Sequence, residues 1–174
     1  MNASRLIEFY LGEVPDAEGR TIHDILNFDL REMETVHDYI QWLFPLKERS
    51  HFNPNAPALS EQDIAQFRRS EYLKRTLLDA FAKMLGFYGL ELQDHRIVRS
   101  SAWDQRKRWL TPFSHNFLRI TRILTSLRLL GLEEYAQAFY VALNDLYKVY
   151  ADRIGSDTWR YWTEAAGQGP PADH

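Results

Sequence analysis

The amino-acid sequence predicts an all-α fold, in which a single domain forms a bundle of six to eight helices with one long proline-rich loop. Two observations lead to this prediction. Apolar residues recur at spacings of three and four along most of the chain, which is the period of a helix with one buried face. In addition, 45% of the 174 residues are hydrophobic and 14% are aromatic, and a chain of this length and composition can bury a core of its own.

Three helices are predicted in the first quarter of the chain. The first covers residues 4–11 with Ser4 as its N-cap, and one or two further helical turns follow from Thr21. The third and longest is predicted over residues 30–44, where apolar side chains share one face. Pro45 ends this helix, because proline has no backbone N–H and disfavours helical angles in the residue before it.

Residues 45–59 are predicted to form the long loop. They include three prolines and show no helical period. Loops of this length in compact domains usually either have a function or move. The next helix begins after Ser60, an N-cap whose partner Asp63 stands three residues later, as in a capping box.

The second half of the chain is predicted to be helical apart from residues 90–102. In that segment Leu92, Ile97 and Val98 would suit an extended strand, but no partner strand is evident elsewhere, so we predict irregular structure. Helices are predicted from Leu73 to Gly86 or Gly89, over residues 103–110, 114–130 and 133–153, and from Ser156, and the domain of residues 1–166 is followed by a flexible tail of residues 167–174.

Composition excludes several kinds of chemistry. The chain has no cysteine, which removes disulfides, thiolate zinc sites and a cysteine nucleophile. No two histidines share a helix face at a spacing of four and no glycine-rich phosphate loop is present, so we expect neither a metal site nor a cofactor. The first residues lack the pattern of a secretory signal and no apolar run reaches the roughly 18 residues that span a bilayer, so we expect a cytoplasmic protein.

The net charge of −3 argues against a protein whose main partner is nucleic acid. The charges are unevenly distributed, because residues 105–132 contain six basic residues and no acidic one. Within this segment Arg106–Arg108 stand between Trp103 and Trp109, a pattern that can bind single-stranded nucleic acid by charge and stacking. A solvated basic face with both tryptophans in the core is the commoner arrangement, and we prefer it.

The first candidate site lies at the end of the predicted 30–44 helix. Residues 37–46 bring histidine, carboxylate and aromatic side chains together next to the loop. One interpretation is a histidine at the edge of the core, hydrogen-bonded to a neighbouring helix. The other is a ligand-binding pocket closed by the loop, for which the candidate residues are His37, Tyr39, Gln41 and Trp42.

The second candidate site is a polar stripe on the predicted 114–130 helix. The stripe residues recur at spacings of four, three and four, and two arginines on such a stripe can bind a carboxylate or a phosphate. Free N–H groups at the start of the helix also favour an anion. Alternatively, the arginines pair with Glu34 or Asp38, or with Glu133 or Glu134. The stripe comprises His115, Arg119, Arg122 and Ser126, and the candidate ligand-binding residues on this helix are His115, Asn116, Arg119 and Arg122.

Motifs spread over roughly residues 6–145 carry a family resemblance. They are Gly19-Arg20-Thr21 with Asp24-Ile25-Leu26, the run from His37 to Pro45, Asn53 with Ala56-Pro57, Phe67-Arg68, Met84-Leu85 with Phe87-Tyr88-Gly89-Leu90, Trp109-Leu110, and His115-Asn116 with Arg119 to Leu124 and Gly131-Leu132. In order and spacing these motifs resemble the conserved N-terminal region of the opioid growth factor receptor family.

The resemblance implies a binding or signalling module. The animal receptor is described as binding a small enkephalin peptide and acting near the nucleus to restrain growth. The charged, repeat-bearing tail that follows the domain in the animal proteins is not found here, so we expect a stand-alone microbial relative.

Taken together, the motifs and the resemblance predict a non-catalytic module. We expect it to bind a small anionic ligand or a peptide between residues 37–46 and residues 115–122. The terminal carboxylate of a peptide would meet Arg119 or Arg122, and its aromatic side chain would pack near the first segment.

Two alternatives use the same sequence differently. In an enzyme, His37 or His115 would act as an acid–base catalyst, oriented by Asp38. In a structural domain that binds another protein or a second copy of itself, an apolar surface would surround Trp159 and Trp162.

Overall fold

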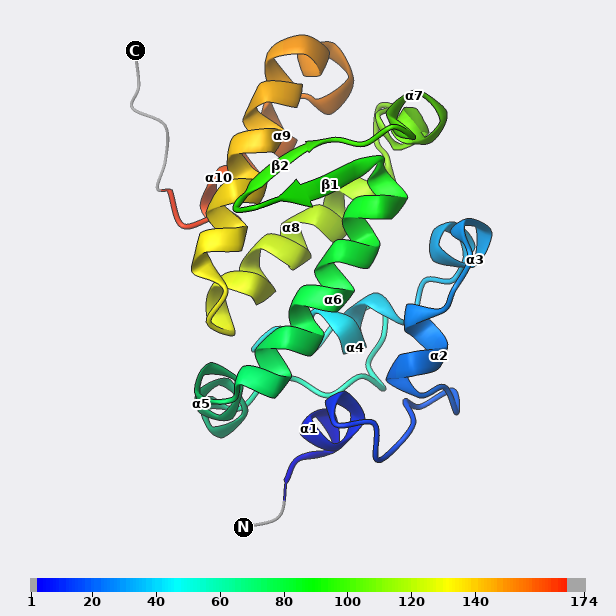
Figure 1. Ribbon diagram of the computed structural model, residues 1–174, viewed down its shortest axis with the longest axis vertical. Helices are drawn as coiled ribbons and strands as arrows, with labels where there is room; N and C mark the ends of the chain where they lie inside the picture. The colour runs from blue at the N-terminus through cyan, green and yellow to red at the C-terminus, as the bar shows by residue number, and fades with distance from the viewer. Residues whose placement is uncertain (1–2, 169–174) are drawn as a thin grey trace. The chain divides into compact units, whose positions relative to one another are not determined.

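The computed structural model describes residues 3–168, and this part of the chain is mostly helical (Figure 1). It contains ten α-helices, one short 3-10 helix and one two-stranded sheet. The mostly helical class is therefore confirmed, whereas the predicted number of six to eight helices is too low. The chain divides into two compact units, Met1–Lys83 and Met84–His174, with the boundary inside helix α6 (Glu71–Tyr88). The expectation of a single domain stays a prediction.

The first unit has an aromatic core around helix α1. The ring of Phe9 lies 5.0 Å from the ring of Trp42, and the ring of Tyr10 lies 4.9 Å from that of Phe67. The Tyr10 hydroxyl donates a hydrogen bond to the Leu43 carbonyl, and burial raises the pKa of this hydroxyl. The helices of this unit are α1 (Arg5–Tyr10), α2 (Ile22–Leu26), α3 (Leu30–Thr35), α4 (Ile40–Leu43), α5 (Glu61–Arg69) and the first part of α6.

Two helix starts in this unit follow the capping rules that the sequence predicts. The Ser4 side chain accepts a hydrogen bond from the Ile7 N–H at 3.2 Å and caps α1. Ser60 and Asp63 form a reciprocal capping box at the start of α5, with both N–H to oxygen distances at 3.0 Å. These side chains bind N–H groups that the first turn of a helix leaves free. Both predicted caps are confirmed.

The single helix predicted over residues 30–44 is wrong. Helix α3 ends at Thr35, Val36 is extended with ψ 127°, and α4 starts only at Ile40. The carbonyl of Asp38 accepts hydrogen bonds from the side chains of Arg20 and Asn53 instead of from a helical N–H. Side chains from two other segments thus bind the non-helical backbone between α3 and α4. His37 and Asp38 therefore lie outside both helices.

The segment between α4 and α5 contains neither helix nor strand. Near its ends the Leu59 N–H donates to the Leu46 carbonyl at 2.8 Å. In its middle, Nη1 of Arg49 donates to the Pro54 carbonyl at 2.8 Å. The loop therefore has specific internal hydrogen bonds.

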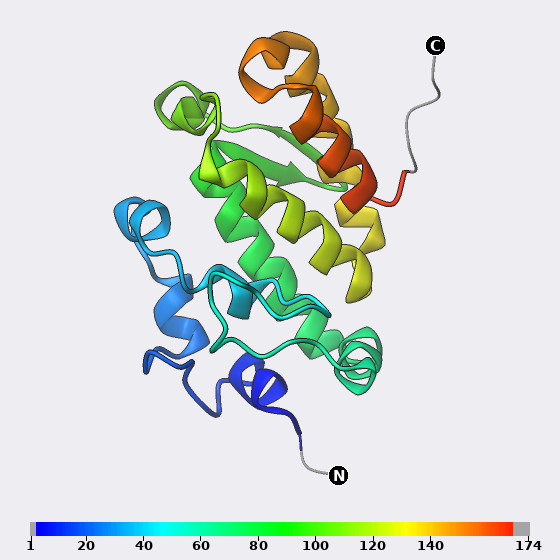
Figure 2. The ribbon, with the colours of Figure 1, turned by 180° about the vertical axis from the view of Figure 1, so that it is seen from behind.

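The second unit contains three long helices and a hairpin (Figures 1 and 2). Helix α8 packs against both α9 and α10. The Trp162 indole N–H donates to the Phe117 carbonyl at 3.1 Å, and the two rings meet edge to face at 5.7 Å. The elements are the end of α6, β1 (Leu90–Gln93), β2 (Arg96–Arg99), α7 (Trp103–Arg106), a 3-10 turn (Lys107–Trp109), α8 (His115–Leu129), α9 (Glu133–Ile154) and α10 (Ser156–Ala165).

The segment predicted to be irregular forms an antiparallel hairpin. Leu90 pairs with Arg99 and Gln93 with Arg96, so both strands lie inside the one segment. Asp94 takes a left-handed φ of 56° in the turn between them, a conformation that aspartate tolerates better than most residues. The prediction failed because it searched for a partner strand elsewhere in the chain.

The two tryptophans of α10, Trp159 and Trp162, pack against other aromatic rings of the second unit. Trp162 is fully buried, so its ring cannot form part of the apolar surface that a structural domain was expected to show. Trp159 is half-buried and stacks between Tyr140 and Tyr147, with both centroid distances at 5.0 Å. Across residues 3–168 we find no helix with the length and apolar character that crossing a membrane requires.

Candidate functional site

Arg20 links two carboxylates in the first unit. Its Nη1 atom lies 2.8 Å from Oδ1 of Asp38, and its Nε and Nη2 atoms lie 2.8 Å and 2.7 Å from Oδ2 of Asp16. Asn53 joins this group, because its Nδ2 donates to the Asp38 carbonyl at 2.9 Å and to Oε1 of Gln41 at 3.3 Å. We call these five residues, Asp16, Arg20, Asp38, Gln41 and Asn53, the Arg20 network.

The buried end of the network is Asp16, whose residue is only 2% exposed. Its Oδ1 accepts hydrogen bonds from the backbone N–H groups of Glu18 and Arg20, both at 2.9 Å. Its Oδ2 faces the guanidinium. A buried carboxylate is tolerated only when its charge is compensated in this way. In the turn before α2, two backbone N–H groups and the Arg20 guanidinium therefore compensate the charge of Asp16.

The surroundings of Arg20 favour its charged form. Burial alone lowers the pKa of Arg20, but its hydrogen bonds to Asp16 and Asp38 and their negative charges outweigh that effect and raise the pKa above its usual value. The guanidinium also lies over the ring of Phe28 at 5.9 Å. Such a group is suited to holding carboxylates in place and not to exchanging protons.

Asn53 and Gln41 connect the loop to α4. Both residues are 8% exposed, and Asn53 reaches the backbone of Asp38 and the side chain of Gln41. Buried amides need hydrogen-bond partners, and these two satisfy each other in part. The proline-containing loop is thereby tied to the start of α4.

The structure separates the predicted site residues of the first unit into buried and exposed ones. Tyr39 and Trp42 are each 1% exposed. Tyr39 donates its hydroxyl to the Met33 carbonyl at 2.6 Å, and the Trp42 ring packs on Phe9. His37 is exposed, and it lies in the non-helical segment between α3 and α4. The two aromatic rings thus contribute to the core of this unit.

In the second unit, the start of α8 brings two predicted residues together. Asn116 is 1% exposed and Arg119 is 7% exposed. Oδ1 of Asn116 accepts hydrogen bonds from Nη1 of Arg119 and from the Tyr88 hydroxyl, each at 3.3 Å. His115 is exposed and Arg122 is half-buried. The structure thus supports a local cluster of Asn116 and Arg119, whereas the expected ligand site formed by both predicted segments stays a prediction.

Acid–base catalysis also stays a prediction. Among the three residues expected to take part, His37 and His115 are exposed. The Asp38 carboxylate accepts a hydrogen bond from Arg20. Within residues 3–168 no group of three or more histidine, aspartate or glutamate side chains is placed to hold a metal ion.

The two tryptophans that flank the basic run are both 5% exposed. The Trp109 indole N–H donates to the Tyr88 carbonyl at 3.0 Å, and Arg106 donates to the Gly86 carbonyl at 2.6 Å. Stacking on nucleobases needs exposed ring faces. The arrangement therefore matches the preferred interpretation, in which Trp103 and Trp109 belong to the core.

Sequence reasoning missed the Arg20 network as a site. Arg20 and Asn53 occur in the motifs of the family resemblance, but no local period links them to Asp38. Asp16 lies between the first two predicted helices and belongs to none of these motifs. A local signal was available, because the Gly19 N–H donates to the Asp16 carbonyl in a four-residue turn, and aspartate at the first and glycine at the fourth position are typical of such turns.

Comparison with known proteins extends the motif resemblance to most of the chain. A family model described as the opioid growth factor receptor (OGFr) conserved region matches residues 1–165. The opioid growth factor receptors of Mus musculus and Homo sapiens are each 41% identical to the chain over 138 residues. Opioid growth factor receptor-like protein 1 of Mus musculus is 38% identical over 135 residues.

These matches cover a small part of the relatives. Each covers 74% of this chain but only 21% of the mouse receptor, 20% of the human receptor and 29% of the mouse receptor-like protein. The chain therefore spans less than a third of the length of these curated relatives. No solved structure matches the chain.

Proposed function

The chain belongs to the opioid growth factor receptor family, and from this membership we propose that it is a non-catalytic binding module of the receptor type. Its ligand is a small anionic molecule or a peptide. Residues 37–46 in the first unit and residues 115–122 in the second are each candidate ligand-binding segments, and both lie within the region that the family model matches.

The observation that carries the non-catalytic part of this proposal is the Arg20 network. Its charged and amide groups bind one another and the backbone. General acid–base catalysis needs a group whose pKa lies near the working pH. Arg20 is the charged centre of the network, and its raised pKa keeps it a permanent cation. The motif residues of the first unit are accordingly better explained as a framework that shapes a binding loop.

The anionic character of the ligand follows from α8. A guanidinium offers two parallel N–H donors to a carboxylate, and the first turn of a helix adds the positive end of its dipole. Arg119 is oriented by Asn116 through the 3.3 Å hydrogen bond. His115 is exposed at the first residue of the helix, where it can be reached from solvent.

Calorimetric titration of the full chain tests this function. The probes are an enkephalin-like peptide with a free terminal carboxylate and the same peptide with an amidated terminus. We expect the free acid to bind and the amide to bind at least about tenfold more weakly, because a hydrogen-bonded ion pair is lost. Arg119→Gln and Arg122→Gln should weaken binding of the free acid by a similar factor.

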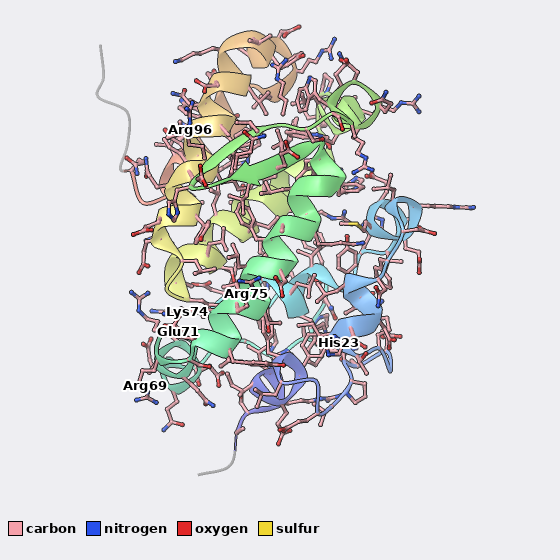
Figure 3. The ribbon with its side chains drawn as sticks, viewed as in Figure 1. His23, Arg69, Glu71, Lys74, Arg75 and Arg96 are labelled. Carbon is pink, nitrogen blue, oxygen red and sulfur yellow. The ribbon has the colours of Figure 1, made fainter. Side chains whose placement is uncertain are left out.

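Arg96→Gln is the matched control, because Arg96 is an exposed arginine on β2 of the same unit (Figure 3). It should leave the affinity unchanged. Equal affinity for the acid and the amide, or wild-type affinity in both α8 variants, would contradict the proposed anion site. Thermal melts of each variant establish that it is folded.

A further inference from the structure

Two exposed arginines of the second unit lie over aromatic rings that contact each other. The Cζ atom of Arg99, at the end of β2, lies 4.7 Å from the ring centroid of Trp103 at the start of α7. The Cζ atom of Arg153, near the end of α9, lies 5.4 Å from the ring centroid of Tyr150. The centroids of the two rings are 6.5 Å apart. We call these four residues the Arg99–Arg153 cluster.

The backbone positions both rings of this cluster. The Ser100 N–H donates to the Gly89 carbonyl at 2.9 Å, and the Trp103 N–H donates to the Ser100 carbonyl at 3.1 Å. A Cβ atom on Gly89 would lie only 3.0 Å from the Cα atom of Trp103, so this close approach favours glycine. On the other side of the cluster, α9 is interrupted at Tyr150, whose φ of −117° and ψ of 30° are not helical.

The two arginines of the cluster have no carboxylate partner among residues 3–168. No acidic side chain in this range forms an ion pair with Arg99 or Arg153, and this includes the exposed Asp152 that precedes Arg153. Three other cations of the unit each pair with an acid three residues earlier, namely Lys107 with Asp104, Lys148 with Asp145 and Arg160 with Asp157. Tyr150 stands at the corresponding position before Arg153. The charge of the cluster is therefore not neutralised by the described part of the chain.

A guanidinium that lies over an aromatic ring keeps its hydrogen-bonding edge available. The ring attracts the cation at its face, whereas the N–H donors of arginine lie in the plane of the guanidinium. Arg20 in the first unit also lies over a ring, but its donors bind two carboxylates. In the described part of the chain no hydrogen bond uses the side-chain donors of Arg99 or Arg153. Both guanidiniums can therefore bind an anion from solution.

The cluster also contains a buried donor for which the chain provides no acceptor. Trp103 is 5% exposed, and its indole Nε1 is the one buried side-chain nitrogen or oxygen within residues 3–168 that has no hydrogen-bond partner. The indole N–H groups of Trp109 and Trp162 in the same unit both donate to backbone carbonyls. Buried polar groups are normally satisfied. The unsatisfied donor belongs to the ring that carries Arg99, so the cluster is incomplete without an acceptor from outside the chain.

We propose that the Arg99–Arg153 cluster binds the phosphate groups of a small soluble molecule, with inorganic diphosphate as its simplest representative. Arginine presents paired N–H donors that match the oxygens of a phosphate. Because the two guanidiniums lie over separate rings, an anion with charge at both ends, such as a diphosphate, suits the cluster better than a single carboxylate. The backbone already positions the rings, so little conformational freedom is lost on binding. This inference does not rest on the proposed anion site of α8.

Calorimetric titration of the full chain with inorganic diphosphate in magnesium-free buffer tests the proposal. We expect diphosphate to bind at least about tenfold more tightly than acetate, which carries one charge. Arg99→Gln and Arg153→Gln should each weaken diphosphate binding by about tenfold or more, because each removes one charge-assisted contact. Both side chains are exposed, so these variants should fold.

Two matched controls separate this site from other cations of the unit. Arg96 is exposed on the same strand as Arg99 (Figure 3), but side chains three residues apart on a strand point to opposite faces. Arg119→Gln removes the candidate anion-binding arginine of α8. Arg96→Gln and Arg119→Gln should both leave the affinity for diphosphate unchanged. Diphosphate should also raise the melting temperature of the wild type and of Arg96→Gln, and have little effect on Arg99→Gln.

The indole N–H resonance of Trp103 in nuclear magnetic resonance spectra gives a local measure of binding. It should shift as diphosphate is added and should reach saturation with the calorimetric affinity. The N–H resonance of Trp162, which is already bonded to the Phe117 carbonyl, should stay in place.

Four results would overturn the proposal. The first is diphosphate binding no tighter than acetate binding, and the second is wild-type affinity in either Arg99→Gln or Arg153→Gln. The third is a Trp103 indole resonance that does not move at saturation. The fourth is binding to vesicles that contain phosphatidylinositol 4-phosphate, or to a single-stranded oligonucleotide, under conditions in which soluble diphosphate does not bind.

Discussion

Arg20 donates a hydrogen bond from Nη1 to Oδ1 of Asp38 at 2.8 Å, across 18 residues of sequence. The same guanidinium faces the buried Asp16 carboxylate. Together these contacts join the turn before α2 and the segment before α4 to the same guanidinium group. The consequences of this arrangement can be measured.

Replacing Arg20 should destabilise the protein strongly. Arg20→Met leaves the buried Asp16 carboxylate without its counter-charge, and breaking a buried pair from one side costs about 3 kcal/mol of unfolding free energy. Urea denaturation at neutral pH measures this loss. Arg75→Met is the control, because the Arg75 side chain is 77% exposed on α6 (Figure 3), and it should change the free energy by less than about 0.5 kcal/mol. Equal effects of the two substitutions would contradict the structural role of Arg20.

Asn53→Ala should loosen the loop. The variant loses the hydrogen bonds to the Asp38 carbonyl and to Gln41, which together stabilise the protein by about 1–2 kcal/mol. The loop should then be cleaved faster by a protease at low concentration, since opening exposes its backbone. Asn55→Ala, at an exposed position of the same loop, should leave the cleavage rate unchanged. Identical rates for both variants would mean that Asn53 does not hold the loop.

Phe113→Gly should stabilise the protein by about 0.5–1 kcal/mol. The substitution removes the strain energy of a bulky residue at φ 61°. The larger backbone entropy of glycine in the unfolded chain offsets part of this gain in unfolding free energy. Urea denaturation checks the sign. Phe52→Gly, at an exposed loop position that is not among the left-handed residues, should give no gain. A loss of stability in Phe113→Gly would show that the ring contributes to the fold.

The buried hydroxyl of Tyr10 should make stability fall at alkaline pH. Because burial raises the folded pKa of Tyr10, its contribution is fully present below the unfolded pKa of about 10. Above that pH the unfolded chain releases a proton that the folded chain retains, so the unfolding free energy falls by about 1.4 kcal/mol per pH unit. Tyr10→Phe should reduce the slope by about this amount between about pH 10 and 11. Tyr161→Phe, at a ring that is 53% exposed, should retain it.

Helix starts and long helices were predictable because their causes are local. The Ser60 and Asp63 pair is three residues apart, and the apolar period of α8 is repeated within single turns. The Ser114 cap follows the same rule, since its side chain accepts from the Asn116 N–H. Such features depend on neighbours in sequence, which a pattern of spacings captures.

The break between α3 and α4 was not predictable from spacing. The apolar pattern continues through residues 30–44, so periodicity alone favours one helix. Helix α3 nevertheless ends at Thr35, and in the segment after it Arg20 and Asn53, from two other segments, bind the carbonyl of Asp38. The two-strand hairpin was missed for a different reason, because both of its strands lie within one short segment and the prediction required a partner strand elsewhere in the chain.

The sequence by itself determined the mostly helical class, the family, and the helix starts, because hydrophobic period, motif order and capping act over a few residues. The tertiary structure decided which motif residues are framework and which remain accessible. Tyr39 and Trp42 are buried, while His37, His115 and Phe113 are exposed. Burial and hydrogen-bond pairing are set by residues distant in sequence, and no local pattern records them.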